Sequence, residues 1–345
     1  MPAAPRAWDT IAELYHAWVT GLILTAITRR SVGDAAELVF RTFRHQQREK
    51  FLAGLDKLQL RGLPPAVACA QYHYLSNDVG GVRVEYVYES DRKAWVRYVR
   101  PRWIYDGATI CAVPSDITRA ILRGWHANNG VLLGNDRLGF VCTKMTTDGQ
   151  PGLEGYYYEH DRPLAPEDRL RFAPGEDGPE FDPARAPQLA AATWPPERLA
   201  RAGRNYAMTY VRTMLLELVD LFGPDEARRL GGITSRLIGM QCYAPTAERL
   251  RVKERSLDAF ARYLTELGQA QGDDTTWMRE GHGVTVLQTS WRLLGSAARE
   301  VSPAMFDVWN ELWVGALSVH DRRARLHVAQ RLDAGAPALV WQLAR

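Results

Sequence analysis

The 345-residue sequence has no block of like charge. Its 43 lysines and arginines nearly balance its 40 aspartates and glutamates, and no run concentrates the net charge of +3. Proteins dedicated to nucleic acid usually carry a basic patch or stripe, so the sequence predicts no nucleic-acid partner. A composition of 46% hydrophobic and 24% charged residues is typical of a globular protein and excludes a disordered or collagen-like chain.

Signals for export and for membrane insertion are also lacking. The N-terminal residues do not combine a basic lead with an apolar stretch and a small-residue cleavage site. The most apolar stretch, residues 18–27, is shorter than the roughly 20 residues that span a bilayer, and it predicts the buried face of a helix. The four cysteines form no Cys-x-x-Cys pair, which favours reduced thiols. The expected location is therefore the cytoplasm, without a membrane partner.

Motifs for nucleotide, cofactor and metal chemistry are missing as well. The sequence contains no P-loop, no Gly-x-Gly-x-x-Gly, no Gly-x-Ser-x-Gly and no His-Glu-x-x-His. Cys69 and His73 are four residues apart, but no second pair with ligand spacing accompanies them. We therefore expect neither a cofactor nor a metal.

What the sequence does contain is the same order of elements twice. Each copy has two helical segments, then strands, a further helix and a closing β-hairpin. The closing hairpins share three pairs of residues that are each 186 positions apart: Gly149 and Gly335, Pro151 and Pro337, and Leu153 and Leu339. Glycine and proline between two alternating runs are typical of hairpin connections. This common offset favours a repeat over chance similarity of two domains.

Other elements can be placed around the hairpins. Ser115 and Ser302, 187 positions apart, are predicted N-caps of a helix in each copy, and Pro303 takes a first helical position. Helical patterns over 8–60 and 205–267 are each interrupted, and runs 82–89 and 283–291 alternate as strands do. The predicted fold class is α+β, a tandem repeat of a helix–helix–strands–helix–β-hairpin unit. Residues 1–161 would form the first repeat, 162–196 a proline-rich acidic linker or arm, and 197–345 a more degenerate second repeat.

Candidate functional residues concentrate in the first repeat, whereas the second repeat is blander at the corresponding places. Three residues are candidates for catalysis and six for substrate binding: His126, Cys142 and Glu85, and Arg97, Trp103, Arg123, Trp125, Asn129 and Tyr156. His126 follows the helix that begins at Ser115, and Asn129 with Gly130 would supply its left-handed C-cap. The helix dipole would favour protonated His126, a candidate general acid or base. A capped helix end with a surface histidine is the alternative.

The remaining candidates also have two interpretations each. Strand alternation places Trp95 and Arg97 on one face and Tyr98 on the other, so Arg97 could hold a carboxylate bidentately or belong to a solvated edge strand. Cys142 is either a thiol nucleophile or a small buried hydrophobe. Glu85 is either an acid–base group or a solvent-facing carboxylate. The aromatic runs at 72–74 and 156–158 are expected in strands, where one tyrosine of each could line a pocket.

The pattern from Ser115 to Tyr158, repeated from Ser302 to Trp341, resembles two families. They are the bacterial L-2-amino-thiazoline-4-carboxylate hydrolase family and the 4-vinyl reductase-type small-molecule-binding domain. The first resemblance implies a cytoplasmic enzyme that opens a C–N or C–S bond of a small cyclic or amide-like compound. The second repeat lacks the closing cysteines associated with both families, so only Cys142 could inherit a thiol or metal role from them.

The expected function follows from these candidates and the resemblance. It is hydrolysis of a C–N or C–S bond in a small carboxylated compound, with His126 as acid or base, Arg97 or Arg123 as carboxylate anchor, and Trp103 and Trp125 as walls. The alternatives are a non-catalytic small-molecule-binding or sensor protein, and a scaffold subunit of a larger enzyme complex. The expected partner is a small-molecule substrate or ligand, with assembly into a homo-oligomer left open.

Overall fold

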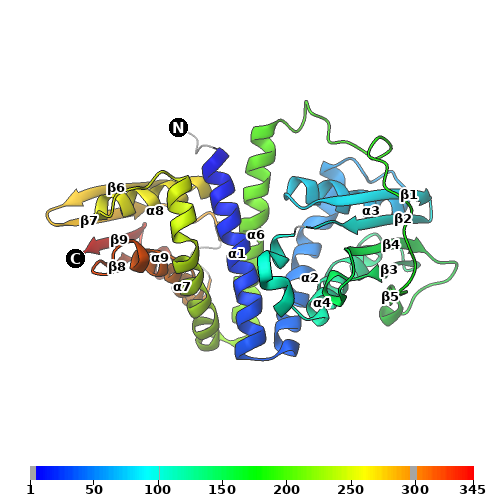
Figure 1. The fold of residues 1–345 in the computed structure, drawn as a ribbon, viewed down its shortest axis with the longest axis horizontal. Coiled ribbons are helices and arrows are strands. Elements are labelled where there is room, and N and C mark those ends of the chain that lie inside the picture. The colour runs from blue at the N-terminus through cyan, green and yellow to red at the C-terminus, as the bar shows by residue number, and fades with distance from the viewer. Residues whose placement is uncertain (1–4, 101, 296–300) are drawn as a thin grey trace. The chain divides into compact units, whose positions relative to one another are not determined.

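A computed structural model describes residues 5–100, 102–295 and 301–345 (Figure 1). Contacts divide the chain into two compact units. Residues 26–199 form one, here called the first-repeat unit, and residues 1–25 with 200–345 form the other, the second-repeat unit. The division falls within the long helices α1 (Pro5–Arg29) and α6 (Pro196–Phe222). The repeat boundaries expected after residues 161 and 196 rest on sequence pattern and stay a prediction.

The fold is α+β, as predicted. The first-repeat unit contains helices α2 (Val32–Lys57), α3 (Pro65–Val79), α4 (Ser115–Gly124) and α5 (Asn129–Leu132). Its strands are β1 (Val84–Ser90), β2 (Lys93–Tyr98), β3 (Leu138–Lys144), β4 (Leu153–Glu159) and β5 (Leu170–Phe172). They form one sheet in the order β1-β2-β4-β3-β5, antiparallel except between β3 and β5.

The second-repeat unit repeats this arrangement. After residues 5–25 of α1 and 200–222 of α6 come α7 (Pro224–Arg249), α8 (Leu257–Gln271) and α9 (Pro303–His320). The strands are β6 (Thr275–Glu280), β7 (Gly283–Gln288), β8 (Arg325–Gln330) and β9 (Leu339–Ala344). Their order β6-β7-β9-β8 matches that of the first sheet without β5. Helix, hairpin, helix and hairpin therefore follow one another in the same order in both units.

Irregular backbone features recur between the repeats too. Gly149 and Gly335 both have positive φ, 81° and 86°, in the closing hairpins, where glycine avoids the strain of a left-handed conformation. Gln59 and Arg251, 192 positions apart, are the described non-glycine residues with positive φ, and each follows the long second helix of its repeat. The backbone thus repeats even where the side chains differ.

Some local predictions need correction. Ser302 caps α9 as predicted, accepting a hydrogen bond from the amide of Ala304, but Ser115 is the first residue of α4 and makes no cap bond. Its hydroxyl donates to the carboxylate of Asp148 instead. The aromatic run at 72–74 lies in α3 rather than in a strand. Asn129 and Gly130 have no left-handed conformation, because the chain continues into α5.

The two faces of the first-repeat sheet have different cores. Helix α3 packs against the inner face, which includes Val96, Tyr98 and Tyr157. Trp95 and Tyr156 form a smaller apolar cluster on the outer face. The alternation predicted for the strand around Arg97 is therefore confirmed.

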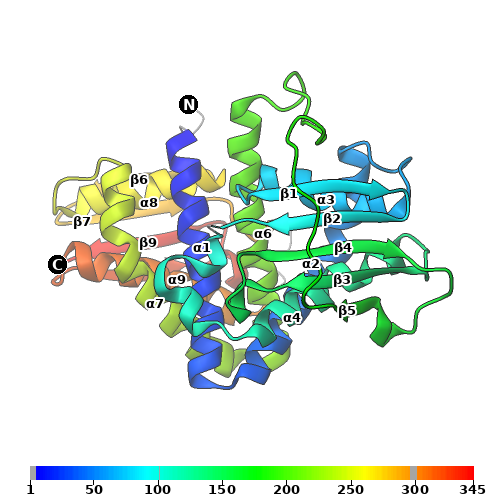
Figure 2. The same cartoon turned by 45° about the vertical axis from the view of Figure 1, so that its right-hand side comes forward.

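An extended segment crosses the outer face after β5 (Figure 2). This segment, residues 173–194, is called the strap below. Its backbone joins the sheet where the amide of Gly178 donates to Glu154 Oε1 at 3.2 Å and Arg97 Nη2 donates to the carbonyl of Pro179 at 3.4 Å. A Cβ on Gly178 would lie only 3.0 Å from the Trp95 ring, so the strap is pressed against the strands.

Helices α7 and α9 of the second-repeat unit approach each other unusually closely. A Cβ on Gly239 would lie 2.0 Å from the carbonyl oxygen of Leu312, and one on Gly315 would lie 2.2 Å from that of Arg236. Glycine is required at both positions because backbone meets backbone there.

Helix α1 is long and apolar enough to cross a membrane by length and composition alone. More than half of its most apolar window is buried in the protein. Tyr15 donates to Gln271 at 2.6 Å and Trp18 to Ser235 at 2.7 Å, both within the second-repeat unit. These contacts are those of a core helix, and the cytoplasmic location stays a prediction.

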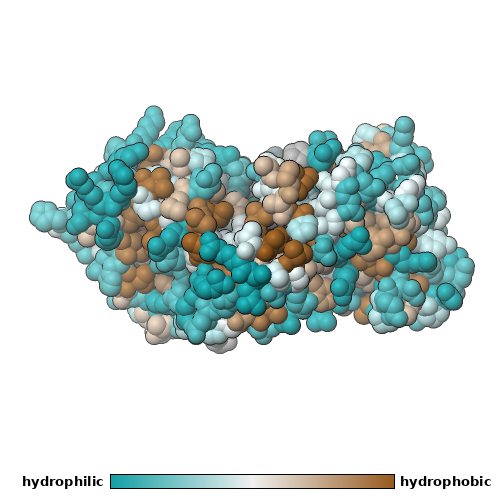
Figure 3. Space-filling model, turned by 60° about the horizontal axis from the view of Figure 1, so that its bottom comes forward, coloured by the Kyte–Doolittle hydropathy of each residue, from teal (hydrophilic) through white to brown (hydrophobic). Residues whose placement is uncertain are grey.

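Large hydrophobic side chains also reach the surface. On the face drawn in Figure 3 they form several groups separated by hydrophilic side chains. In the second-repeat unit the exposed examples include Leu237, Trp277, Met278 and Val319. A scaffold subunit would present such side chains to a partner, and the hypothesis of a scaffold subunit stays a prediction.

Candidate functional site

A buried network of histidine, tyrosine and amide side chains lies behind the first-repeat sheet. The imidazoles of His73 on α3 and His126, in the turn after α4, stack with ring centroids 4.1 Å apart. The hydroxyl of Tyr98 lies 2.9 Å from His73 Nδ1 and 3.2 Å from His126 Nε2. The hydroxyl of Tyr157 lies 2.8 Å from His126 Nδ1. Both histidines are only 4% exposed, so the network excludes bulk water.

The side-chain amide of Asn129 determines which nitrogen of His73 accepts a hydrogen bond and which one donates. Gln47 donates to Asn129 Oδ1 at 3.1 Å, which leaves the Asn129 Nδ2 hydrogens for Tyr157 Oη at 2.8 Å and His73 Nε2 at 3.3 Å. His73 Nε2 must then accept, so His73 carries its proton on Nδ1 and donates to Tyr98. His126 meets the Tyr98 hydroxyl through Nε2 and the Tyr157 hydroxyl through Nδ1, and a neutral imidazole donates through one of these nitrogens and accepts through the other. Each imidazole is neutral and uses both nitrogens.

Burial enforces this neutral state. It lowers the pKa of His73 to about 3. Burial, together with the electrostatic influence of His73 and Arg102, lowers the pKa of His126 well below its ordinary value. The expectation that a helix dipole favours protonated His126 is wrong, because desolvation outweighs any dipole at this depth.

Five of the nine predicted site residues lie on or near the inner side of the sheet: His126, Cys142, Trp103, Trp125 and Asn129. Trp125 stacks on Tyr72 and meets His73 edge-on, with centroids 6.3 and 6.1 Å apart. Trp103 is half-buried against the same core. Burial raises the pKa of the Cys142 thiol to about 12, which favours the interpretation of Cys142 as a small buried hydrophobe.

Glu85, Arg97 and Tyr156 lie on the opposite face. Arg97 Nη1 is 2.6 Å from Glu85, and its Nε pairs with Glu154, a side chain only 1% exposed. Burial raises the pKa of Glu154, but its bonds with Arg97 and Lys144 outweigh this, and the net shift is downward. Two carboxylates therefore neutralise Arg97, which leaves it poorly suited to hold a third.

Arg123 occupies a third place, exposed at the end of α4, with its guanidinium 5.3 Å from the centre of the Phe40 ring. The structure therefore distributes the nine predicted residues over three places rather than one.

No family model, no curated protein and no solved structure matches this chain. The resemblance to the two families stays a prediction, and the site has to be argued from its own geometry.

Several residues of the network are absent from the predicted set. Tyr98 and Tyr157 occupy inner-face positions, so the alternation of β2 and β4 would have selected Tyr157 over Tyr156. His73 could not be connected with His126 from sequence, because α3 and the turn after α4 meet only in the fold. Gln47 comes from α2.

Arg102 was also missed. Its Nε and Nη1 are shielded from water and have no hydrogen-bond partner among the described residues. The guanidinium lies 4.6 Å from the Tyr98 ring centre and 5.6 Å from that of Tyr105. Trp125 Nε1 is likewise buried without a partner. Three donor nitrogens without a partner among the described residues therefore belong to side chains that contact Tyr98 or His73.

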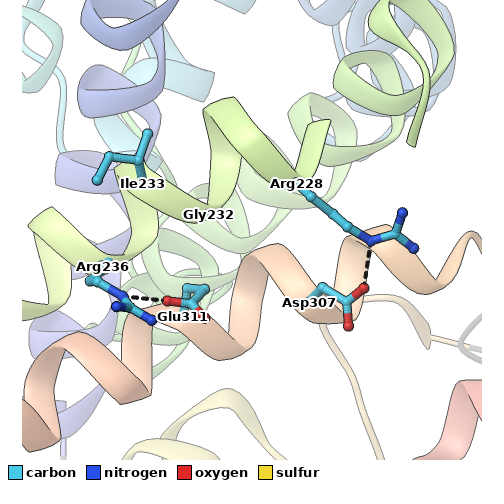
Figure 4. A pocket seen from close by; sticks show the side chains of 6 residues that line it. All are labelled: Arg228, Gly232, Ile233, Arg236, Asp307 and Glu311. Atoms are coloured by element: carbon cyan, nitrogen blue, oxygen red, sulfur yellow. Dashed lines mark hydrogen bonds and ion pairs between the residues drawn. The ribbon is translucent and has the colours of Figure 1, made fainter. Parts of the chain in front are cut away.

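The second-repeat unit has a surface groove of about 380 Å³ between α7 and α9 (Figure 4). Arg228 pairs with Asp307 at 2.8 Å and Arg236 with Glu311 at 2.6 Å. The four charged side chains that line the groove are therefore already paired with one another. Over the described part of the chain, no three His, Cys, Asp or Glu side chains gather as a metal site would require.

Proposed function

We propose that the first-repeat unit is a non-catalytic module that binds a small carboxylated molecule beside the histidine–tyrosine network. One observation carries this proposal: two buried nitrogens of the Arg102 guanidinium have no acceptor among the residues that the structure describes. A buried donor without a partner costs roughly 1–3 kcal/mol, and more when it is charged. A carboxylate would supply the missing acceptors, and such charge-assisted bonds are strong.

The surroundings of Arg102 support a flat ligand. The rings of Tyr98 and Tyr105 lie against its guanidinium. Trp125, whose indole nitrogen is also without a partner among the described residues, meets His73 edge-on on the same side of the sheet. Aromatic side chains with a few placed polar groups are typical of small-molecule sites. An aromatic or heteroaromatic carboxylate fits this combination.

The experiment compares benzoate binding by the wild type and by Arg102→Met, which keeps the apolar stem and removes the donors. We expect the affinity to fall by at least tenfold, while the unliganded variant is as stable as the wild type or about 1 kcal/mol more stable, because an unpaired buried cation is gone. Arg100→Met, at an exposed arginine of the same loop, is the matched control. Calorimetric titration and urea denaturation measure both effects. Equal binding by Arg102→Met, or no binding by the wild type, would contradict the proposal.

Hydrolysis is the second candidate, because the neutral His126 accepts a hydrogen bond through one ring nitrogen, as a general base could, and lies between two tyrosine hydroxyls. The binding proposal is favoured because both nitrogens of His126 are already in use. Carboxylated amides and 2-amino-thiazolines are the substrates to assay. We expect no turnover by the wild type; turnover that is lost in His126→Gln would replace binding by hydrolysis as the function.

A further inference from the structure

Four arginines from separate stretches of the chain come together in the first-repeat unit. Arg44 and Arg48 belong to α2, Arg123 lies at the end of α4, and Arg169 ends a short turn at Pro166–Arg169. The sequence has no basic run that predicts this cluster, because only the fold brings the four arginines together.

Arg44 is the fixed centre of the cluster. Its Nε donates to the carbonyl of Gly124 at 2.8 Å and its Nη2 to that of Arg123 at 2.7 Å. These carbonyls end α4, where the helix dipole is negative, so Arg44 is held there as a helix cap. The guanidinium carbons of Arg44 and Arg123 lie 5.2 and 5.3 Å from the centre of the same Phe40 ring. Two cations therefore share one aromatic ring.

The positive charge of the cluster is uncompensated. Within the described residues, none of the four arginines has an ion pair with a carboxylate. Arg92 and Arg137 of the same unit each have one, and Arg97 has two. The Nε of Arg169 is also shielded from water without a hydrogen-bond partner.

The other three arginines act electrostatically on Arg44. Burial, together with the positive charges of Arg48, Arg123 and Arg169, lowers the pKa of Arg44. Like charges repel one another, and an anion placed among them would offset this repulsion.

We propose that these four arginines bind a small phosphorylated molecule through its phosphate group. A carboxylate offers one negative charge, whereas a phosphate carries nearly two at neutral pH and three acceptor oxygens. Guanidinium groups match the geometry of phosphate oxygens and bind them bidentately. A nucleic acid would instead need a stripe of positive charge along several phosphates. In this cluster Arg44 and Arg123 share one phenylalanine ring, and Arg48 and Arg169 act on Arg44, which is not a stripe.

The experiment titrates inorganic pyrophosphate at low salt into the full chain. Arg48 and Arg123 are exposed, so the double variant Arg48→Gln with Arg123→Gln removes two charges without touching the helix cap made by Arg44. We expect the affinity to fall about tenfold for each arginine removed. Arg61→Gln is the matched control, because Arg61 is exposed and pairs with Asp56 at 2.7 Å just beyond α2. Unfolding curves verify that all variants are folded.

Three outcomes would overturn the proposal. The first is equal pyrophosphate affinity in the wild type and the double variant, and the second is no binding at millimolar concentration. The third is sulfate binding as tight as pyrophosphate binding, which would reduce the cluster to an adventitious ion site. Phenyl phosphate distinguishes the source of the group: tighter binding than inorganic phosphate supports an organic phosphate as the ligand. Tighter binding of a DNA duplex than of pyrophosphate, lost in the double variant, would assign the cluster to nucleic acid.

Discussion

Replacing Gly239 by alanine is expected to lower the free energy of unfolding of the second-repeat unit by about 3 kcal/mol or more. The new methyl group would lie 2.0 Å from the carbonyl oxygen of Leu312 and 3.0 Å from the amide nitrogen of Ala316. Neither backbone atom can move aside as a flexible side chain could. Helices α7 and α9 would have to separate, which is the costly kind of overpacking. At roughly 2–4 °C per kcal/mol, the melting temperature should fall by about 6 °C or more.

Gly232 provides the matched control on the same helix. A Cβ there meets nothing closer than Glu311 Cγ at 3.7 Å, which is ordinary contact. Alanine also has the higher helix propensity, so Gly232→Ala should be neutral or stabilising by roughly 0.5–1 kcal/mol. Urea denaturation followed by circular dichroism measures both variants. Equal effects of the two substitutions would show that close backbone contact does not hold α7 and α9 together.

Acidification from pH 7 to pH 4 is expected to destabilise the first-repeat unit steeply, because His73 and His126 are neutral in the folded state. In the unfolded chain an imidazole takes up a proton near pH 6.5. Burial lowers the pKa of folded His73 to about 3. Between these values the unfolded state binds more protons. As the pH is lowered through this range, the free energy of unfolding therefore decreases by about 1.4 kcal/mol per pH unit for each imidazole that stays neutral in the folded state.

The hydrogen-bond directions give this effect a second cause. A proton on His73 Nε2 would face the Asn129 amide hydrogen across the 3.3 Å contact between the two nitrogens. Urea titrations at several pH values test the prediction. The variant His73→Gln should be less stable than the wild type at pH 7. Its free energy of unfolding should also depend less steeply on pH, by the contribution of one imidazole. His282→Gln, in the exposed β6–β7 turn, should leave the slope unchanged. An unaltered slope in His73→Gln would refute the assignment.

The repeat could be predicted from sequence because its markers are local. Gly149 and Gly335 determine the shape of a turn within a few residues, and so their offset was visible. Gly130 shows where local reasoning fails. It was expected to supply a left-handed C-cap, yet a Cβ there would lie 2.7 Å from the carbonyl oxygens of Asn135 and Leu138. Its glycine serves a close approach between segments, which local sequence does not reveal.

The candidate site was predicted only in part, for a similar reason. Residue type singled out His126, but its neutral state depends on His73, Tyr98 and Tyr157, which come from three other elements. Alternation placed Arg97 on the correct face of its strand. That Glu154 lies opposite it follows from the pairing of β2 with β4, which determines the charge that Arg97 meets.

The segment that follows the closing hairpin of the first repeat also determines which strands lie at the edge of the sheet, where a strand of another molecule could pair with them. In the first-repeat sheet β5 pairs with β3, so β3 has a neighbour on both sides, whereas its counterpart β8 is an outer strand. Outer strands can recruit strands of other chains and aggregate. β3 is almost entirely buried and apolar, while β8 begins with the exposed Arg325 and is followed by Arg331. The partial covering of β3 by β5 and the exposed charge of Arg325 on β8 each make pairing with a strand of another chain less favourable.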